Sequence, residues 1–156
     1  MKKEKLKILI IRFSSIGDIV LTTPVIRCIK QQLADVEIHY LTKKAFEPVL
    51  AANPFIEKLH FLKDSLPESI AELRSEKFDH VIDLHHNLRT LLIKTSLGVR
   101  SSSFDKLNWQ KWLLVNFKKN FLPPVHIVER YLDTAKSLGV KNDGKGLDYF
   151  LIDNYK

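Results

Sequence analysis

Two serines, a glycine and a carboxylate follow directly after the first apolar run of the chain. Residues 14–18 read Ser-Ser-Ile-Gly-Asp, and they stand between the largely apolar residues 8–13 and a stretch with helical periodicity. In open α/β sheets, ligands bind at the carboxyl ends of the strands, often against the start of a helix. A carboxylate at that place, Asp18, can take a proton as a general base, or it can cap the helix that follows. The residues alone leave both roles open.

The neighbours of Asp18 suit the same site. The hydroxyl groups of Ser14 and Ser15 can donate hydrogen bonds to a sugar or a phosphate, or they can satisfy backbone groups of the turn. Gly17 lets a ligand approach the backbone closely. Arg12 lies inside the strand pattern, where it serves either a buried ion pair or a ligand contact.

A second polar group follows the predicted strand at residues 79–84. It contains His85, His86, Asn87 and Arg89, and the carboxyl ends of parallel strands share one edge, so we expect it beside Asp18. Asn87 and Arg89 are candidates to contact a sugar or a carboxylate. The alternatives are a helix cap for Asn87 and a solvated side chain for Arg89. Adjacent histidines point in different directions and no third ligand is suitably spaced, so we expect no metal and no cofactor.

Strand and helix patterns alternate along the chain. We predict strands at residues 6–13, 36–41, 56–62, 79–84 and 99–104. We predict helices from the first turn to residue 33, and at residues 44–52, 66–76, 87–97, 109–121 and 125–138. Thr23-Pro24 marks either the start of the first helix or a bend within it, and residues 147–152 form either a last strand or a connection. Repeated β-α-β units with right-handed crossovers predict an α/β fold, a Rossmann-like three-layer domain with a mostly parallel sheet.

Composition narrows the class of protein. The chain has 156 residues, which predicts one domain, and its formal net charge of +7 favours anionic partners. No helix-turn-helix, RNP or zinc-finger pattern is present, so we do not expect nucleic acid as a partner. The single cysteine, Cys28, excludes an internal disulfide and has the helical spacing of a packing residue. No cleavable signal peptide or spanning apolar stretch is seen, so we expect a cytoplasmic location.

The motifs of two common nucleotide-binding classes are missing, which argues against an NAD dehydrogenase and a P-loop NTPase. The dinucleotide fingerprint G-x-G-x-x-G is absent, because the first turn holds only Gly17. The phosphate-binding loop G-x-x-x-x-G-K-[ST] is also absent. The sequence therefore favours a Rossmann-like half that binds something other than a dinucleotide.

Three segments carry a resemblance to a known family. Residues 12–24, Arg-Phe-Ser-Ser-Ile-Gly-Asp-Ile-Val-Leu-Thr-Thr-Pro, resemble the N-terminal signature of the heptosyltransferases of lipopolysaccharide core synthesis, glycosyltransferase family nine. Residues 83–90, Asp-Leu-His-His-Asn-Leu-Arg-Thr, and residues 126–132, His-Ile-Val-Glu-Arg-Tyr-Leu, are similar to two later motifs of that family. The resemblance spans most of the chain.

The resemblance implies the N-terminal half of a GT-B enzyme, in which two Rossmann-like domains face each other across a cleft. Residues 1–146 would bind a lipid-linked anionic sugar acceptor, and residues 147–156 would begin the linker to a C-terminal domain, missing here, that binds the ADP-heptose donor. Asp18 matches the proposed catalytic base of the family, and Ser14, Ser15, Gly17, Asn87 and Arg89 would contact substrate. We expect the half alone to be inactive.

Two further expectations concern partners. Residues 109–121 place two tryptophans and two phenylalanines at helical spacing among lysines, a pattern that suits a membrane interface, core packing or a surface for a second domain. A peripheral contact at the inner face of the cytoplasmic membrane would follow from the first of these. The alternative function is a stand-alone, non-catalytic binding module for an anionic sugar or nucleotide.

Overall fold

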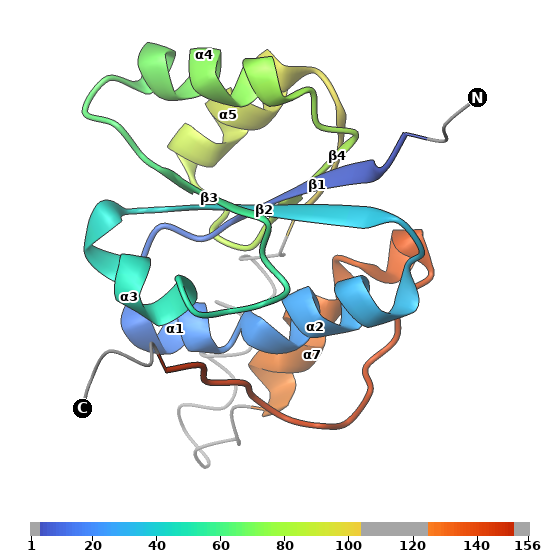
Figure 1. Cartoon of the computed structure of the whole chain (residues 1–156). Helices are drawn as coiled ribbons and strands as arrows, with labels where there is room; N and C mark the ends of the chain where they lie inside the picture. Colours follow the sequence, from blue (N-terminus) through green and yellow to red (C-terminus); the bar gives the residue numbers. More distant parts are fainter. Residues whose placement is uncertain (1–3, 104–124, 152–156) are drawn as a thin grey trace, which may run out of the picture.

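One parallel sheet organises the protein. The computed structural model describes residues 4–103 and 125–151. The strands are β1 (Leu6–Ile11), β2 (Val36–Thr42), β3 (Lys58–Phe61), β4 (His80–Asp83) and β5 (Arg100–Ser103). They lie in the order β3-β2-β1-β4-β5, with every pairing parallel (Figure 1). The predicted α/β class and parallel sheet are confirmed.

Helices cover both faces of the sheet. One face carries α1 (Ile16–Val20), α2 (Thr23–Gln32), α3 (Glu47–Leu50) and α7 (Val125–Asp133), and the other carries α4 (Leu66–Glu76) and α5 (Leu88–Leu97) (Figure 1). Short 3₁₀ turns precede α3 and follow α7, at Lys44–Phe46 and Lys136–Leu138. This three-layer arrangement is the predicted Rossmann-like fold.

The central strand explains why the first apolar run is nearly continuous. Ile8 and Ile10 of β1 pack into the core beneath α2, whereas Leu9 and Ile11 pack into the core beneath α4 and α5. Because both faces of a central parallel strand are buried, its residues need not alternate with polar ones.

The first predicted helix is interrupted. It divides into α1 and α2, with Thr22 as the N-cap of α2 and Pro24 in its first turn. Proline has no backbone N–H to continue the α1 hydrogen bonds. The hydroxyl of Thr23 instead donates to the carbonyl of Val20 at 2.7 Å. Thr23-Pro24 therefore starts a helix, but this helix is the second after β1 and its N-cap is Thr22, so neither interpretation holds as predicted.

Two other predicted helices differ in extent, and the open choice at residues 147–152 is decided for the described residues. The helix expected at residues 44–52 is a 3₁₀ turn followed by the four-residue α3. The helix expected at residues 125–138 ends at Asp133, and a 3₁₀ turn then reaches Gly139, whose φ of 79° is readily adopted by glycine. Residues 147–151 form a connection and no strand. The predicted helix at residues 109–121 lies outside the described residues.

A buried arginine fastens the last described segment to α2. The side chain of Arg27 makes two 2.8 Å contacts with the carboxylate of Asp143 and one of 2.6 Å with that of Asp148. These hydrogen bonds hold the pKa of the Asp143 carboxyl well below its ordinary value. The neighbouring Cys28 is fully buried, as its spacing predicts.

Candidate active site

The turn after β1 places Asp18 at the carboxyl edge of the sheet. Ser15 is the N-cap of α1, and Asp18 is the third residue of that helix. The carboxylate oxygen Oδ2 of Asp18 accepts a hydrogen bond from the Ser15 hydroxyl at 2.8 Å and one from the Ser15 backbone N–H at 3.3 Å. Asp18 therefore does cap the helix, in the capping-box arrangement.

Arg12 supplies a third contact to the same oxygen. Its Nη2 lies 3.1 Å from Asp18 Oδ2, so Arg12 forms an ion pair that is partly buried, and a ligand contact of Arg12 stays untested. Its Nε donates to the carbonyl of Ser14 at 2.7 Å, and its Nη1 donates to the carbonyl of Leu84 at 2.9 Å. The guanidinium thus links the turn that carries Asp18 to the end of β4.

The second oxygen of Asp18 differs from the first. Within residues 4–103 and 125–151, Oδ1 accepts no hydrogen bond, and the Asp18 side chain is 37% exposed. A carboxylate fixed through one oxygen and open at the other can receive a proton from a hydroxyl group placed beside it. Capping and proton transfer are therefore compatible roles for this residue.

The turn is exposed in the described part of the chain. A Cβ atom added to Gly17 would meet nothing within 4 Å, and Ser15, Ile16 and Gly17 are all exposed. Ser14 is partly buried and its carbonyl is held by Arg12. Among the described residues, nothing would obstruct a ligand next to Gly17, and the ligand contacts of Ser14, Ser15 and Gly17 stay predictions.

The loop after β4 lies at the same edge. The buried carboxylate of Asp83 forms an ion pair with Lys94 at 2.9 Å, and its Oδ1 accepts the backbone N–H groups of His85 and His86 at 3.0 and 2.8 Å. Phe13 joins this loop to the first turn, because its ring centroid lies 4.8 Å from that of His85. The two predicted polar groups are therefore neighbours in space.

Asn87 and Arg89 have structural partners in this loop. Asn87 is the N-cap of α5, and its side-chain oxygen accepts the backbone N–H of Thr90 at 2.9 Å. No described residue bonds the amide nitrogen of Asn87, which leaves that donor for a ligand. Arg89 is exposed, with its guanidinium 5.5 Å from the ring centroid of Phe13. Substrate contact by either residue stays a prediction.

Two parts of this site were missed in the sequence. The ring of Phe13 and the ion pair of Asp83 with Lys94 both shape the loop after β4. The sequence did contain a sign of the Asp83 contacts, because a carboxylate at the end of a buried strand needs hydrogen-bond donors or a cation beside it. Its charged partner on α5 could not be identified without the fold.

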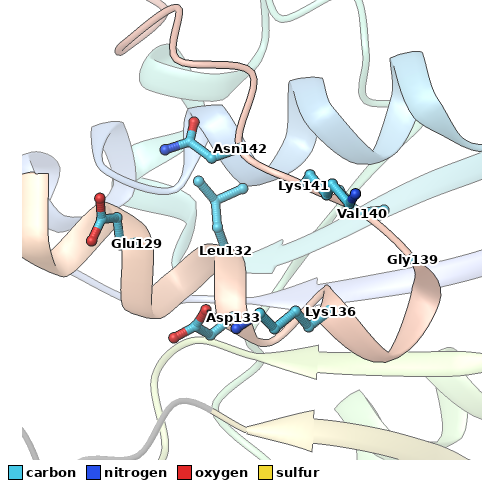
Figure 2. Close-up of a pocket in the computed structure, with 8 residues that line it drawn as sticks. All are labelled: Glu129, Leu132, Asp133, Lys136, Gly139, Val140, Lys141 and Asn142. Atoms are coloured by element: carbon cyan, nitrogen blue, oxygen red, sulfur yellow. Dashed lines mark ion pairs between the residues drawn. The ribbon is translucent and has the colours of Figure 1, made fainter.

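A separate cavity of about 360 Å³ lies between the second half of α7 and the segment that follows it (Figure 2). It is lined by Glu129, Leu132, Asp133, Lys136, Gly139, Val140, Lys141 and Asn142. Gln32, at the end of α2, exchanges hydrogen bonds of 2.6 and 2.8 Å with the backbone of Lys141. This contact holds one lining residue of the cavity against the end of α2.

Comparison with known proteins gives sequence relatives. The chain is 32% identical to lipopolysaccharide heptosyltransferase 1 of Campylobacter coli over 162 aligned residues, which cover 95% of this chain and 47% of that protein. It is 30% identical to lipopolysaccharide heptosyltransferase 3 of Escherichia coli K12, over 80% of this chain and 40% of that protein. No protein-family model matches. The chain spans about half the length of the curated relatives it matches.

Solved structures share the fold. A family 9 glycosyltransferase from Veillonella parvula superposes with a TM-score of 0.73 at 20% identity, over 98% of this chain and 47% of that chain. The E. coli heptosyltransferase WaaC, solved with ADP-2-deoxy-2-fluoro heptose, superposes with a TM-score of 0.67 at 21% identity, over 91% and 51%. In sequence and in fold, the chain resembles one half, the N-terminal domain, of the GT-B heptosyltransferases of glycosyltransferase family 9.

Proposed function

We propose that this chain is the acceptor-side half of an inverting glycosyltransferase of the heptosyltransferase type, with Asp18 as its general base. The observation that supports the proposal best is the asymmetry of the Asp18 carboxylate. Oδ2 is held by Ser15 and Arg12, while Oδ1 accepts no hydrogen bond from any residue that the structure describes. The sequence relatives are lipopolysaccharide heptosyltransferases, which move heptose onto a sugar acceptor.

The proposed reaction is a direct displacement at the sugar. An acceptor hydroxyl attacks the anomeric carbon of ADP-heptose from the face opposite the nucleotide, and Asp18 Oδ1 takes the hydroxyl proton. The bond from the anomeric carbon to the phosphate oxygen breaks, and ADP leaves with that electron pair. Such general-base assistance contributes about 10²–10⁴-fold to the rate.

The acceptor would be a lipid-linked anionic sugar bound across the two loops. Ser14 and Ser15 precede α1 and Gly17 lies in its first turn, while Asn87 caps α5 and Arg89 lies in its first turn. Arg89 is exposed and the chain carries a net charge of +7, so an anionic acceptor is favoured electrostatically.

The donor would be bound mainly by a second domain outside this chain. The span of the match, about half of each relative, supports this division. Residues 1–146 would then form the acceptor domain and residues 147–156 would begin the linker, with residues 143 and 148 tied to α2 through Arg27.

We also propose that the protein works in the cytoplasm, at the inner face of the cytoplasmic membrane where a lipid-linked acceptor would lie. In the described parts of the chain, none of the helices has the length and apolar character needed to span a bilayer. Residues 109–121, which prompted the membrane-contact prediction, lie outside the described residues.

The proposal is tested by a transfer assay in which the chain is joined to a GT-B donor domain. The substrates are ADP-heptose and a lipid A fragment bearing Kdo. We expect Asp18→Asn to lower turnover by about 10²-fold or more, because the amide cannot accept the proton. Asp64→Asn, at an exposed loop carboxylate, is the matched control. Normal turnover of Asp18→Asn would remove Asp18 from the mechanism.

A further inference from the structure

Two buried histidines meet beneath α4, on the opposite face of the sheet from α2. His39 belongs to β2 and His60 to β3, and each is only 1% exposed. His39 Nδ1 lies 2.9 Å from His60 Nε2. The sequence pattern indicates no more for either residue than a place in a strand or on the surface.

The outer nitrogen of each ring has a carboxylate partner. His39 Nε2 lies 2.7 Å from Glu37 Oε1, and His60 Nδ1 lies 3.1 Å from Glu72 Oε1. An ionised carboxylate only accepts hydrogen bonds, so each ring donates its outer N–H. A neutral ring then carries its lone pair on the inner nitrogen. Two lone pairs facing each other at 2.9 Å require a positive species beside them, which is either a shared proton or a metal ion.

A third donor lies within reach of the pair. Glu76 Oε2 of α4 is 3.9 Å from His39 Nδ1, and the ligand atoms of His39, His60 and Glu76 all lie within 4.8 Å of one another. A glutamate carboxylate is ordinarily ionised at neutral pH, as a metal ligand must be.

We propose that His39, His60 and Glu76 form a binding site for a divalent transition-metal ion of the Zn²⁺ class. Two imidazole nitrogens and one carboxylate oxygen are a donor set typical of Zn²⁺, with a fourth position left for water. Glu37 and Glu72 orient the two rings, as carboxylates commonly do behind metal-bound histidines. The ion joins β2, the edge strand β3 and α4, so its effect is to stabilise that side of the sheet.

Two lysines compete with the ion for Glu76. Lys58 Nζ lies 2.5 Å from Oε1, and Lys7 Nζ lies 3.3 Å from Oε2. The Lys58 side chain is 52% exposed, so it can turn into solvent when an ion binds. We therefore expect Lys58→Gln to tighten Zn²⁺ binding, whereas a pair that merely shares a proton predicts no such effect.

The test is calorimetric titration of ZnCl₂ into the metal-free chain without an affinity tag. We expect one ion per chain and a melting temperature that rises with Zn²⁺. Glu76→Gln and His60→Gln should each weaken binding by at least tenfold, and Glu72→Gln by about 10–100-fold. His80→Gln is the matched control, because His80 is a buried strand histidine outside the cluster and should leave binding unchanged.

Nitrogen NMR of the two rings decides between the two occupants. Direct Zn²⁺ ligation shifts the resonances of His39 Nδ1 and His60 Nε2 together, and this result supports the site. If His60→Gln fails to fold, Glu76→Gln still tests the site, because it removes a ligand without altering the buried histidines. Absence of stoichiometric binding, binding unchanged in both ligand variants, or a proton still shared between the rings in excess Zn²⁺ would each overturn the proposal.

Discussion

Arg12 Nη2 and Asp18 Oδ2 form a 3.1 Å ion pair at the carboxyl end of β1. The same guanidinium bonds the carbonyl of Leu84 at the end of β4, so the orientation of Asp18 depends on two strands of the sheet as well as on its own turn. A side chain held in this way has fewer conformations to lose when it takes part in chemistry.

Replacing Arg12 should destabilise the protein. Arg12→Met leaves the carbonyls of Ser14 and Leu84 without their donor, and we expect the free energy of unfolding to fall by about 1–3 kcal/mol. Urea denaturation measures this, with the exposed Arg89→Met as control. Equal stability of Arg12→Met and the parent chain would mean that these contacts are replaced by water at no net cost.

Replacing Arg27 should lower the free energy of unfolding by more than replacing Arg12. Its side chain is 5% exposed and faces the carboxylates of Asp143 and Asp148, which Arg27→Met would leave unpaired. Breaking such a buried pair costs about 3–5 kcal/mol, and partial exposure of the two carboxylates favours the lower end. The measurement is chemical denaturation beside the surface control Lys141→Met, and a loss below about 1 kcal/mol would contradict the expectation.

At acidic pH, Asp143 should no longer contribute to the stability of the folded protein. Arg27 lowers the pKa of this carboxyl in the folded protein, while the unfolded chain keeps a value of about 3.9. The stabilisation is therefore fully present above that pH and is lost as the pH falls toward the folded pKa. Unfolding free energies of the parent and Asp143→Asn, measured from neutral pH downward, should differ at pH 7 and converge in acid. A difference that stays constant with pH would refute this assignment.

Asn87 offers a way to separate capping from binding. Asn87→Ala removes the cap of α5 and should lower the free energy of unfolding by about 1 kcal/mol. Asn87→Ser keeps a capping oxygen but loses the amide donor, so it should retain stability and weaken acceptor binding. Thermal denaturation and acceptor titration are compared for both variants. Unaltered acceptor affinity in Asn87→Ser would restrict the residue to its structural role.

The sequence predicted the features that depend on local pattern. The apolar run of β1 and the alternation of strands and helices depend on neighbouring residues, and so does the cap at Asn87, which was one of two roles left open for that residue. The motif at residues 14–18 indicated the edge of the sheet at which Asp18 lies, because parallel strands place their carboxyl ends together.

The features that the sequence did not reveal depend on distant residues. Arg27 meets Asp143 only after the chain has folded across α2, and no periodicity relates the two. His39 meets His60 because β2 and β3 pair in the register that places His60 beside Leu41. Glu76 comes close to them because α4 packs over these two strands. Such contacts require the pairing of strands and the packing of helices, which single-sequence patterns do not specify.

The most direct test of the account is an NMR titration of this chain with the Kdo-bearing lipid A fragment and, separately, with ADP-heptose. The acceptor-side proposal predicts saturable binding of the fragment, with shifts centred on Gly17 and Asp18 and extending to Asn87. It predicts little binding of ADP-heptose by this chain alone. Tight binding of ADP-heptose without binding of the acceptor would contradict the account, since it would assign this half to the donor.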